Sequence, residues 1–167
     1  MMTGILLLSF LLTGCGSPEP QTGKKMSMYY INTAETKVEV HEQYLNTKTL
    51  DEQLDETMRY LSTTPEKLEY KAPLDMGFHV LDYEVEDGKL LINVDKAYSE
   101  LSPTTEVLVR AAIVRTLTQL PNVKYVGITV EDSQLYDNAG EMVGWMNADQ
   151  FINNDGNAVS YTHLTLP

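Results

Sequence analysis

The stretch EVLVRAAIVRTLTQLPNVKYVGITV, residues 106–130, decides the fold because it joins an apolar helix to a β-strand. Just before it, Ser102 offers a hydroxyl cap and Pro103 suits the first helical position, where its missing amide hydrogen costs nothing. A helix cannot continue through Pro121, so the pattern predicts a helix from Pro103 to that point. Residues 123–130 then alternate as a half-buried strand does, with apolar side chains at Val126, Ile128 and Val130.

This helix has very little polar surface for a protein whose net charge is −12. Its apolar residues are Val107, Leu108, Val109, Ala111, Ala112, Ile113, Val114, Leu117 and Leu120. A helix that packs on one sheet needs an apolar stripe only about 100° wide, and this one is much wider. More than one neighbour must therefore cover it, and the candidates are the first helix, a long loop or a partner protein.

Two strands are expected near the start of the domain. Residues 28–32 are aromatic and β-branched, which favours a strand. Residues 37–44 alternate, with Val38, Val40 and Tyr44 on one side, as in a half-buried strand. The other side of this strand is polar and consists of Lys37, Glu39, His41 and Gln43.

A shorter helix should follow these strands. Thr49 and Glu52 have the spacing of a capping box, in which each side chain bonds the other residue's backbone amide. Leu50, Leu54, Met58 and Leu61 then form one apolar stripe. The acids Asp51, Glu52, Asp55 and Glu56 lie outside it, which is typical of a surface helix.

A hairpin completes the set of elements. Residues 78–85 and 89–94 flank Glu86-Asp87-Gly88, and Asp-Gly between two β-rich runs favours a tight turn because both turn positions need a positive φ. The element order is β-β-α-β-β-α-β, with residues 142–152 unassigned. This order predicts an α+β fold, a small mixed or antiparallel sheet with two helices packed on it.

The N-terminus carries a targeting signal. Residues 4–12 form an apolar run too short to cross a bilayer about 30 Å thick, but of the length of a signal-peptide core. The run ends in Leu12, Thr13, Gly14 and Cys15, which resemble a bacterial lipobox. In a lipobox the cysteine thiol is alkylated with diacylglycerol, and cleavage leaves that cysteine as the first residue of the mature protein. Cys15 is the only cysteine, so no disulfide is expected. No cofactor is expected either, and the one bound group we predict is the diacylglycerol thioether on Cys15.

We therefore divide the chain into four segments. They are a lipoprotein signal peptide (residues 1–14), a lipidated cysteine with a flexible tether (15–25), a domain (26–153) and a disordered or non-native tail (154–167). Two or three acyl chains anchor a protein stably. We expect the domain at the outer face of the cytoplasmic membrane.

The charged residues exclude one class of partner and offer little catalysis. Nucleic acid is not expected as a partner, because 24 acidic residues against 12 basic ones repel phosphates. The histidines have no metal-ligand spacing, so no metal site is expected at His41, His79 or His163. Paired carboxylates could act as acid and base on a glycan, and the candidates are Asp82, Glu84, Glu86 and Asp87. Acids at the end of a hairpin are usually solvated, so we predict no catalytic residue.

Two further segments invite a binding interpretation. Residues 137–141 and 153–157 are rich in Asp, Asn and Gly but lack the spacing of a calcium loop, so turns are expected. Gly144, Trp145, Met146 and Phe151 predict an apolar patch that packs back on the core or receives a partner.

The block over residues 106–130 resembles the signature of the GerMN domain, the sporulation and spore germination domain of Gram-positive bacteria. In this family an apolar helix ends in Thr-Leu-Thr-x-Leu-Pro, and a short turn leads to Val-x-x-Val at the start of a strand. The matching residues are Thr116, Leu117, Thr118, Leu120, Pro121, Val123 and Val126. The hairpin over residues 85–98 and the lipobox are also similar to features of the family, so the resemblance covers about residues 26–153.

The resemblance implies a fold like that of ring-building modules and no known catalytic activity. It also implies a membrane-anchored module, attached to the cytoplasmic membrane through its lipid, that binds envelope or sporulation proteins and acts in sporulation or germination. The alternative function is a module that binds or processes peptidoglycan.

Overall fold

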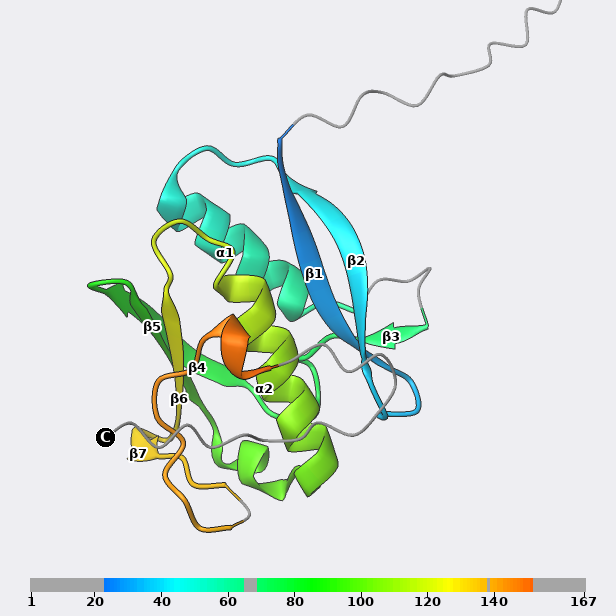
Figure 1. Ribbon diagram of the computed structural model, residues 1–167, viewed down its shortest axis with the longest axis vertical. Coiled ribbons are helices and arrows are strands. Elements are labelled where there is room, and N and C mark those ends of the chain that lie inside the picture. Colours follow the sequence, from blue (N-terminus) through cyan, green and yellow to red (C-terminus); the bar gives the residue numbers. More distant parts are fainter. Residues whose placement is uncertain (1–22, 65–68, 138, 152–167) are drawn as a thin grey trace, which may run out of the picture.

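The computed structural model describes residues 23–64, 69–137 and 139–151, which form two β-sheets with a long helix between them (Figure 1). The N-terminal sheet has the strand order β2-β1-β3 and the C-terminal sheet has the order β4-β5-β6-β7. The elements are β1 (Lys24–Asn32), β2 (Val38–Leu45), α1 (Leu50–Leu61), β3 (Tyr70–Lys71), β4 (Val80–Glu86), β5 (Lys89–Val94), η1 (Lys96–Glu100), α2 (Pro103–Leu117), β6 (Tyr125–Val130), β7 (Ser133–Gln134) and η2 (Ala148–Gln150). The α+β class is confirmed, with the strands divided between two sheets.

The C-terminal sheet is mixed. Its strands β4 and β5 form an antiparallel hairpin around Asp87 and Gly88, whose φ angles of 50° and 80° fit the expected turn. Strands β5 and β6 are parallel, because α2 forms the crossover between them. Strand β7 then pairs antiparallel with β6.

The N-terminal sheet is built on a long antiparallel pair, β1 with β2. Strand β3 is only two residues long and pairs with β1 at Ile31 and Asn32 alone. The remainder of that edge of β1 receives side chains from α2 and from the turn that follows it, instead of another strand. The strands therefore do not join into one continuous sheet.

Helix α2 lies at the centre of the domain and is covered from within it. It contacts β1, β2, β6, α1 and η2, and its buried residues extend around most of its circumference. The expected cap at Ser102 is present, since Ser102 Oγ accepts a hydrogen bond from the Thr105 amide at 3.2 Å. The helix ends at Leu117, before the expected end at Leu120, because the amides of Gln119 and Leu120 bond three residues back in a tighter turn.

Strand β1 begins inside the segment that we expected to be tether (15–25). Lys24 pairs with Leu45 of β2, and its Nζ donates to the Gln119 carbonyl at 3.2 Å. Lys25 likewise pairs with Tyr44 and forms an ion pair with Glu42 at 2.8 Å. The two lysines join the sheet because each has both a backbone partner and a side-chain partner there.

Helix α1 has the expected capping box at Thr49, but Glu56 is only 7% exposed rather than outside the apolar stripe. Its carboxylate accepts hydrogen bonds from the amides of Asn46 and Thr47 and from Thr47 Oγ1 at 2.7 Å. Burial opposes ionisation of Glu56, but these hydrogen bonds outweigh burial and hold its pKa below the ordinary value. Glu56 therefore fixes the connection between β2 and α1.

Strand β2 alternates as expected, but the middle of its apolar side, at Val40, faces outward, while Val38 packs against the core. The buried side chains of β1 at Met28 and Met26 lie opposite His41 and Gln43, so the polar side of β2 shares the inner face. Val40 pairs with Tyr29 on the other face and is 50% exposed. Polar residues are tolerated inside because β2 lies at the rim of the core, where Gln43 Nε2 donates to Tyr60 Oη of α1 at 3.0 Å.

Candidate interaction surface

The turn at the end of α2 bonds directly to β1. Thr116 Oγ1 accepts a hydrogen bond from the Tyr29 amide at 3.0 Å. The Gln119 side chain bonds the Ser27 backbone twice, with Oε1 accepting from its amide at 3.0 Å and Nε2 donating to its carbonyl at 2.7 Å. These side chains satisfy groups that a neighbouring strand would otherwise satisfy. This segment therefore closes an edge of the N-terminal sheet.

The other residues of the GerMN-like signature stabilise the same region. Thr118 Oγ1 donates to the Val114 carbonyl at 2.7 Å, a local bond within α2. Pro121 is exposed and follows the turn. The apolar residues of the signature are all buried in the core, namely Leu117, Leu120, Val123 and Val126. Gln119 was missed by the sequence reasoning because it occupies the variable position of Thr-Leu-Thr-x-Leu-Pro.

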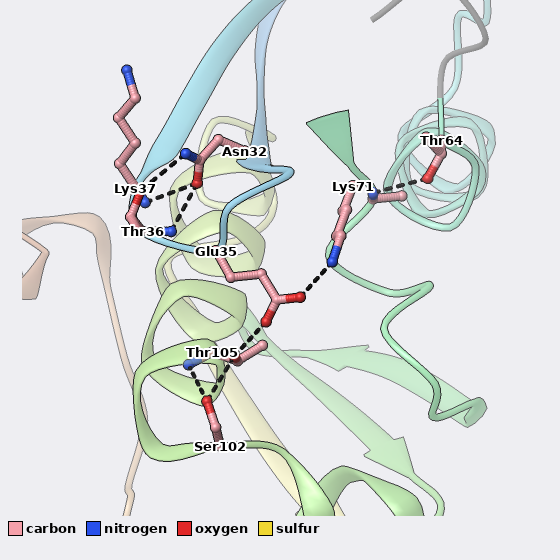
Figure 2. Close-up of polar contacts among 9 residues, drawn as sticks. Asn32, Glu35, Thr36, Lys37, Thr64, Lys71, Ser102 and Thr105 are labelled. Atoms are coloured by element: carbon pink, nitrogen blue, oxygen red, sulfur yellow. Dashed lines mark hydrogen bonds and ion pairs between the residues drawn. The ribbon is translucent and has the colours of Figure 1, made fainter. Parts of the chain in front are cut away.

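A polar cluster at the turn between β1 and β2 was also not foreseen (Figure 2). The Glu35 carboxylate forms an ion pair with the Lys71 ammonium and accepts a hydrogen bond from Thr105 Oγ1 at 2.6 Å. The hydrogen bond from Lys71, followed by that from Thr105, holds the pKa of Glu35 below its ordinary value of 4.5. Because Glu35 of the turn bonds both Lys71 of β3 and Thr105 at the start of α2, the cluster acts as a polar clamp that holds these three elements together.

The exposed acids of β4 belong to a different surface, the outer face of the C-terminal sheet. Asp82, Glu84 and Glu86 alternate along β4 and are exposed on this face. The adjacent strands add Leu91 beside Glu84 and Tyr125 next to Lys89. Asp87, by contrast, lies in the hairpin turn. The structure thus brings three of the four candidate acids together, on an open face.

Trp145 lies over the same face. Its ring packs so closely on Gly127 that a Cβ atom there would lie 2.8 Å from a ring carbon and 3.2 Å from Leu91 Cδ1. The segment is held by a pair of backbone hydrogen bonds between Val126 and Met146, both at 2.8 Å. Trp145 nevertheless remains 42% exposed, and the Lys89 ammonium lies 5.4 Å from its ring centroid.

The expected apolar patch therefore divides into two parts. Met146 and Phe151 are buried and pack back on the core. Gly144 and Trp145 are exposed, and Trp145 joins the outer face of the C-terminal sheet. The segment that pairs with Val126 is extended there, so the neighbouring side chains of Trp145 and Met146 point to opposite faces of the sheet.

A cleft of about 420 Å³ lies next to β1. It is lined by Tyr29, Arg115, Thr118, Gln119, Ala148, Asp149 and Phe151. The Arg115 guanidinium stacks 4.1 Å from the Tyr29 ring centroid and its Nη2 donates to Tyr29 Oη at 3.3 Å. The cleft borders the edge that Gln119 closes, and none of the four candidate acids of the hairpin lines it.

The described residues contain no group of three or more His, Cys, Asp or Glu side chains that could hold a metal ion. Two of the histidines lie in the described residues. His79 Nδ1 lies 2.9 Å from Asp95 Oδ2, and this contact lowers the pKa of the Asp95 carboxyl group. His41 lies on β2, in the N-terminal sheet. Asp137 Oδ1 accepts from the amides of Ala139 and Glu141, both at 2.9 Å, as expected for a turn. His163 and residues 153–157 lie outside the described residues.

The anchoring signal also lies outside the described residues, since Leu12, Thr13, Gly14 and Cys15 belong to the segment 1–22. Within the described ranges, no helix has the length and apolarity that crossing a bilayer would require. Lipid attachment at Cys15 stays a prediction from the sequence.

Comparison with known proteins identifies the family. Residues 27–136, well over half of the chain, match the family Germane, described as sporulation and spore germination. Among curated proteins, none matches the chain. The fold resembles the first GerMN domain of the sporulation protein GerM from Bacillus subtilis, at 14% identity and a TM-score of 0.55 over 72% of this chain and 94% of that one.

A second solved structure contains the tandem GerMN domains of the same Bacillus subtilis protein. It matches at 18% identity and a TM-score of 0.53 over 81% of this chain, and the match covers 49% of the tandem chain, about half its length. At these identities the likeness concerns the fold, whereas the match over residues 27–136 establishes the family. The chain belongs to the Germane family of sporulation and spore germination domains, and its fold is of the GerMN type.

Proposed function

We propose that this chain is a lipid-anchored, extracytoplasmic GerMN module that binds other envelope proteins during sporulation or germination. The observation that carries the proposal is the outer face of the C-terminal sheet, where Trp145 and Tyr125 are 42% and 41% exposed. Aromatic side chains of this kind are enriched where proteins bind one another. The chain acts by assembly, without a catalytic step.

The lipobox supports the location. Cys15 would be attached to the cytoplasmic membrane by its diacylglycerol thioether, and the short segment before Lys24 would hold the domain close to the outer face of that membrane. A Cys15→Ser variant should leave the membrane fraction after an alkaline wash. The variant Cys15→Ser/Ser17→Cys, which moves the thiol by two positions, should do the same. Retention of either variant in the membrane would contradict the anchor.

The second candidate function is binding or processing of peptidoglycan. It is favoured by the same face, because flat aromatic rings beside the carboxylates of Glu84 and Glu86 offer apolar and polar contacts to a sugar. The two functions separate in a pull-down of the detergent-solubilised full chain with purified sacculi stripped of proteins. We expect no retention and no release of glycan fragments. Saturable retention on the bare wall would favour the second function over the first.

A further inference from the structure

The outer face of the C-terminal sheet combines two kinds of side chain in register. Its acidic row consists of Asp82, Glu84 and Glu86 of β4, and its apolar strip consists of Leu91, Tyr125 and Trp145. The row and the strip lie on the same face, as the position of Asn93 on β5 shows. Asn93 Nδ2 donates to Asp82 Oδ2 of the row at 3.1 Å. Asn93 and Leu91 of the strip are alternate residues of β5, so their side chains point to the same side of the sheet.

The three carboxylates of the acidic row take part in none of the ion pairs within the described part of the chain. Lys89 lies opposite Glu86 on the same face but contacts the Trp145 ring instead. Alternate residues of a strand stand about 7 Å apart, so the row presents three negative charges at regular spacing. A partner with positive charges at the same spacing matches this row, and alternate residues of an extended chain have that spacing.

The apolar strip also accepts a cation. The Lys89 ammonium lies 5.4 Å from the centroid of the Trp145 ring, which is a cation–π contact made by the protein with itself. The ring rests on Gly127, so its position is set by the sheet rather than by a mobile loop. A lysine or arginine from a partner would meet the same ring and carboxylates, while apolar residues between them would cover Leu91 and Tyr125.

We propose that the outer face of the C-terminal sheet docks a cationic amphipathic segment of a partner protein, one in which Lys or Arg alternates with apolar residues. The proposal rests on the proposed function, because it names the chemistry of the partner that the module binds. The acidic row supplies orientation and rapid encounter, and the apolar strip supplies the buried contact.

The test uses Trp145, the only tryptophan of the chain, as the reporter. The full chain in non-ionic detergent micelles is titrated with a synthetic peptide of alternating Lys and Leu, and the emission of Trp145 is followed. A face variant carries Asp82→Asn, Glu84→Gln and Glu86→Gln. A control variant carries the same charge change at exposed positions elsewhere, Asp51→Asn, Glu69→Gln and Glu100→Gln.

We expect saturable binding with equal midpoints for the natural chain and the control variant. The face variant should need about tenfold more peptide, since each exposed ion pair contributes a few-fold. The natural chain should also bind more weakly as salt is added. Equal midpoints for the face and control variants would overturn the proposal. So would equal binding of a peptide in which Glu replaces Lys, or a saturable response to peptidoglycan fragments with none to the Lys peptide.

The proposed function has its own readout, so the two failures can be told apart. If the face and control variants titrate alike but in-cell crosslinking still captures envelope proteins from other surfaces, the docking proposal fails and the proposed function stands. If the bare wall retains the chain and no protein is captured, both fail.

Discussion

The substitution Thr116→Val tests how the GerMN-like signature holds the domain together. Thr116 is fully buried, and valine has nearly the same size and shape, so the substitution removes the hydroxyl group without creating a cavity. Two hydrogen bonds are lost. Oγ1 no longer accepts from the Tyr29 amide, and it no longer donates to the Ala112 carbonyl at 2.8 Å.

The loss at Tyr29 dominates the expected cost. Its amide points away from β2 and toward α2, so it is left without its partner at a partly buried position, which costs about 1 to 3 kcal/mol. The Ala112 carbonyl can keep its bond within the helix and adds little. We therefore expect the free energy of unfolding to fall by about 2 kcal/mol, a large part of the 5–15 kcal/mol typical of a domain, with a Tm lower by about 8 °C.

Thr118→Val is the matched control in the same turn. The Thr118 hydroxyl donates only to the Val114 carbonyl, which also accepts the Thr118 backbone amide at 3.1 Å. Its removal should cost less than about 0.5 kcal/mol, because bonds of this kind add little to a helix. Urea unfolding of the full chain, followed by Trp145 fluorescence and circular dichroism, measures both variants. Equal stabilities of Thr116→Val and Thr118→Val would refute the idea that the signature closes the edge of β1.

Two further predictions concern the outer face and the polar clamp. Gly127→Ala places a Cβ atom 2.8 Å from the Trp145 ring, so the ring should tilt off the sheet and the fluorescence emission of Trp145 should shift to the red. Gly144→Ala is the control, because no atom lies within 4 Å of the added Cβ, and it should leave the emission unchanged. Glu35→Gln should lower the free energy of unfolding by about 1 kcal/mol at neutral pH, because it weakens the contacts with Lys71 and Thr105. Since the pKa of Glu35 is lowered on folding, its contribution is complete above the ordinary value of 4.5 and is lost as the pH falls through the folded-state value. Urea titrations of both chains at neutral and acidic pH check this, and a deficit that persists unchanged at pH 2 would contradict it.

Elements with local signals could be predicted from the sequence. The capping box at Thr49, the Ser102-Pro103 helix start and the Asp87-Gly88 turn all appear in the structure, because each depends on residues within a few positions of one another. The breadth of apolar surface on α2 also indicated correctly that several neighbours cover it, and those neighbours lie within the domain.

Features that depend on distant residues could not be predicted. The bonds from Gln119 to Ser27 and from Thr105 to Glu35 join residues 92 and 70 positions apart, and no short pattern marks them. Alternation in β2 gave two sides but not which of them faces the core, because that depends on the register with β1. The same limit applies to the candidate site, since the alternation of acids on β4 was visible but the arrival of Trp145 beside them was not.

The most direct test of the central claim, that this module binds proteins through the outer face of its C-terminal sheet, is site-specific photocrosslinking of the full chain in growing and sporulating cells. A benzophenone side chain replaces Tyr125 on the face or, as the control, Leu50 on α1, and the two positions are matched at 41% and 42% exposure. The account predicts a discrete protein adduct at Tyr125, absent at Leu50 and lost when Asp82, Glu84 and Glu86 are neutralised. Adducts equal at both positions, or adducts to glycan alone, would contradict it.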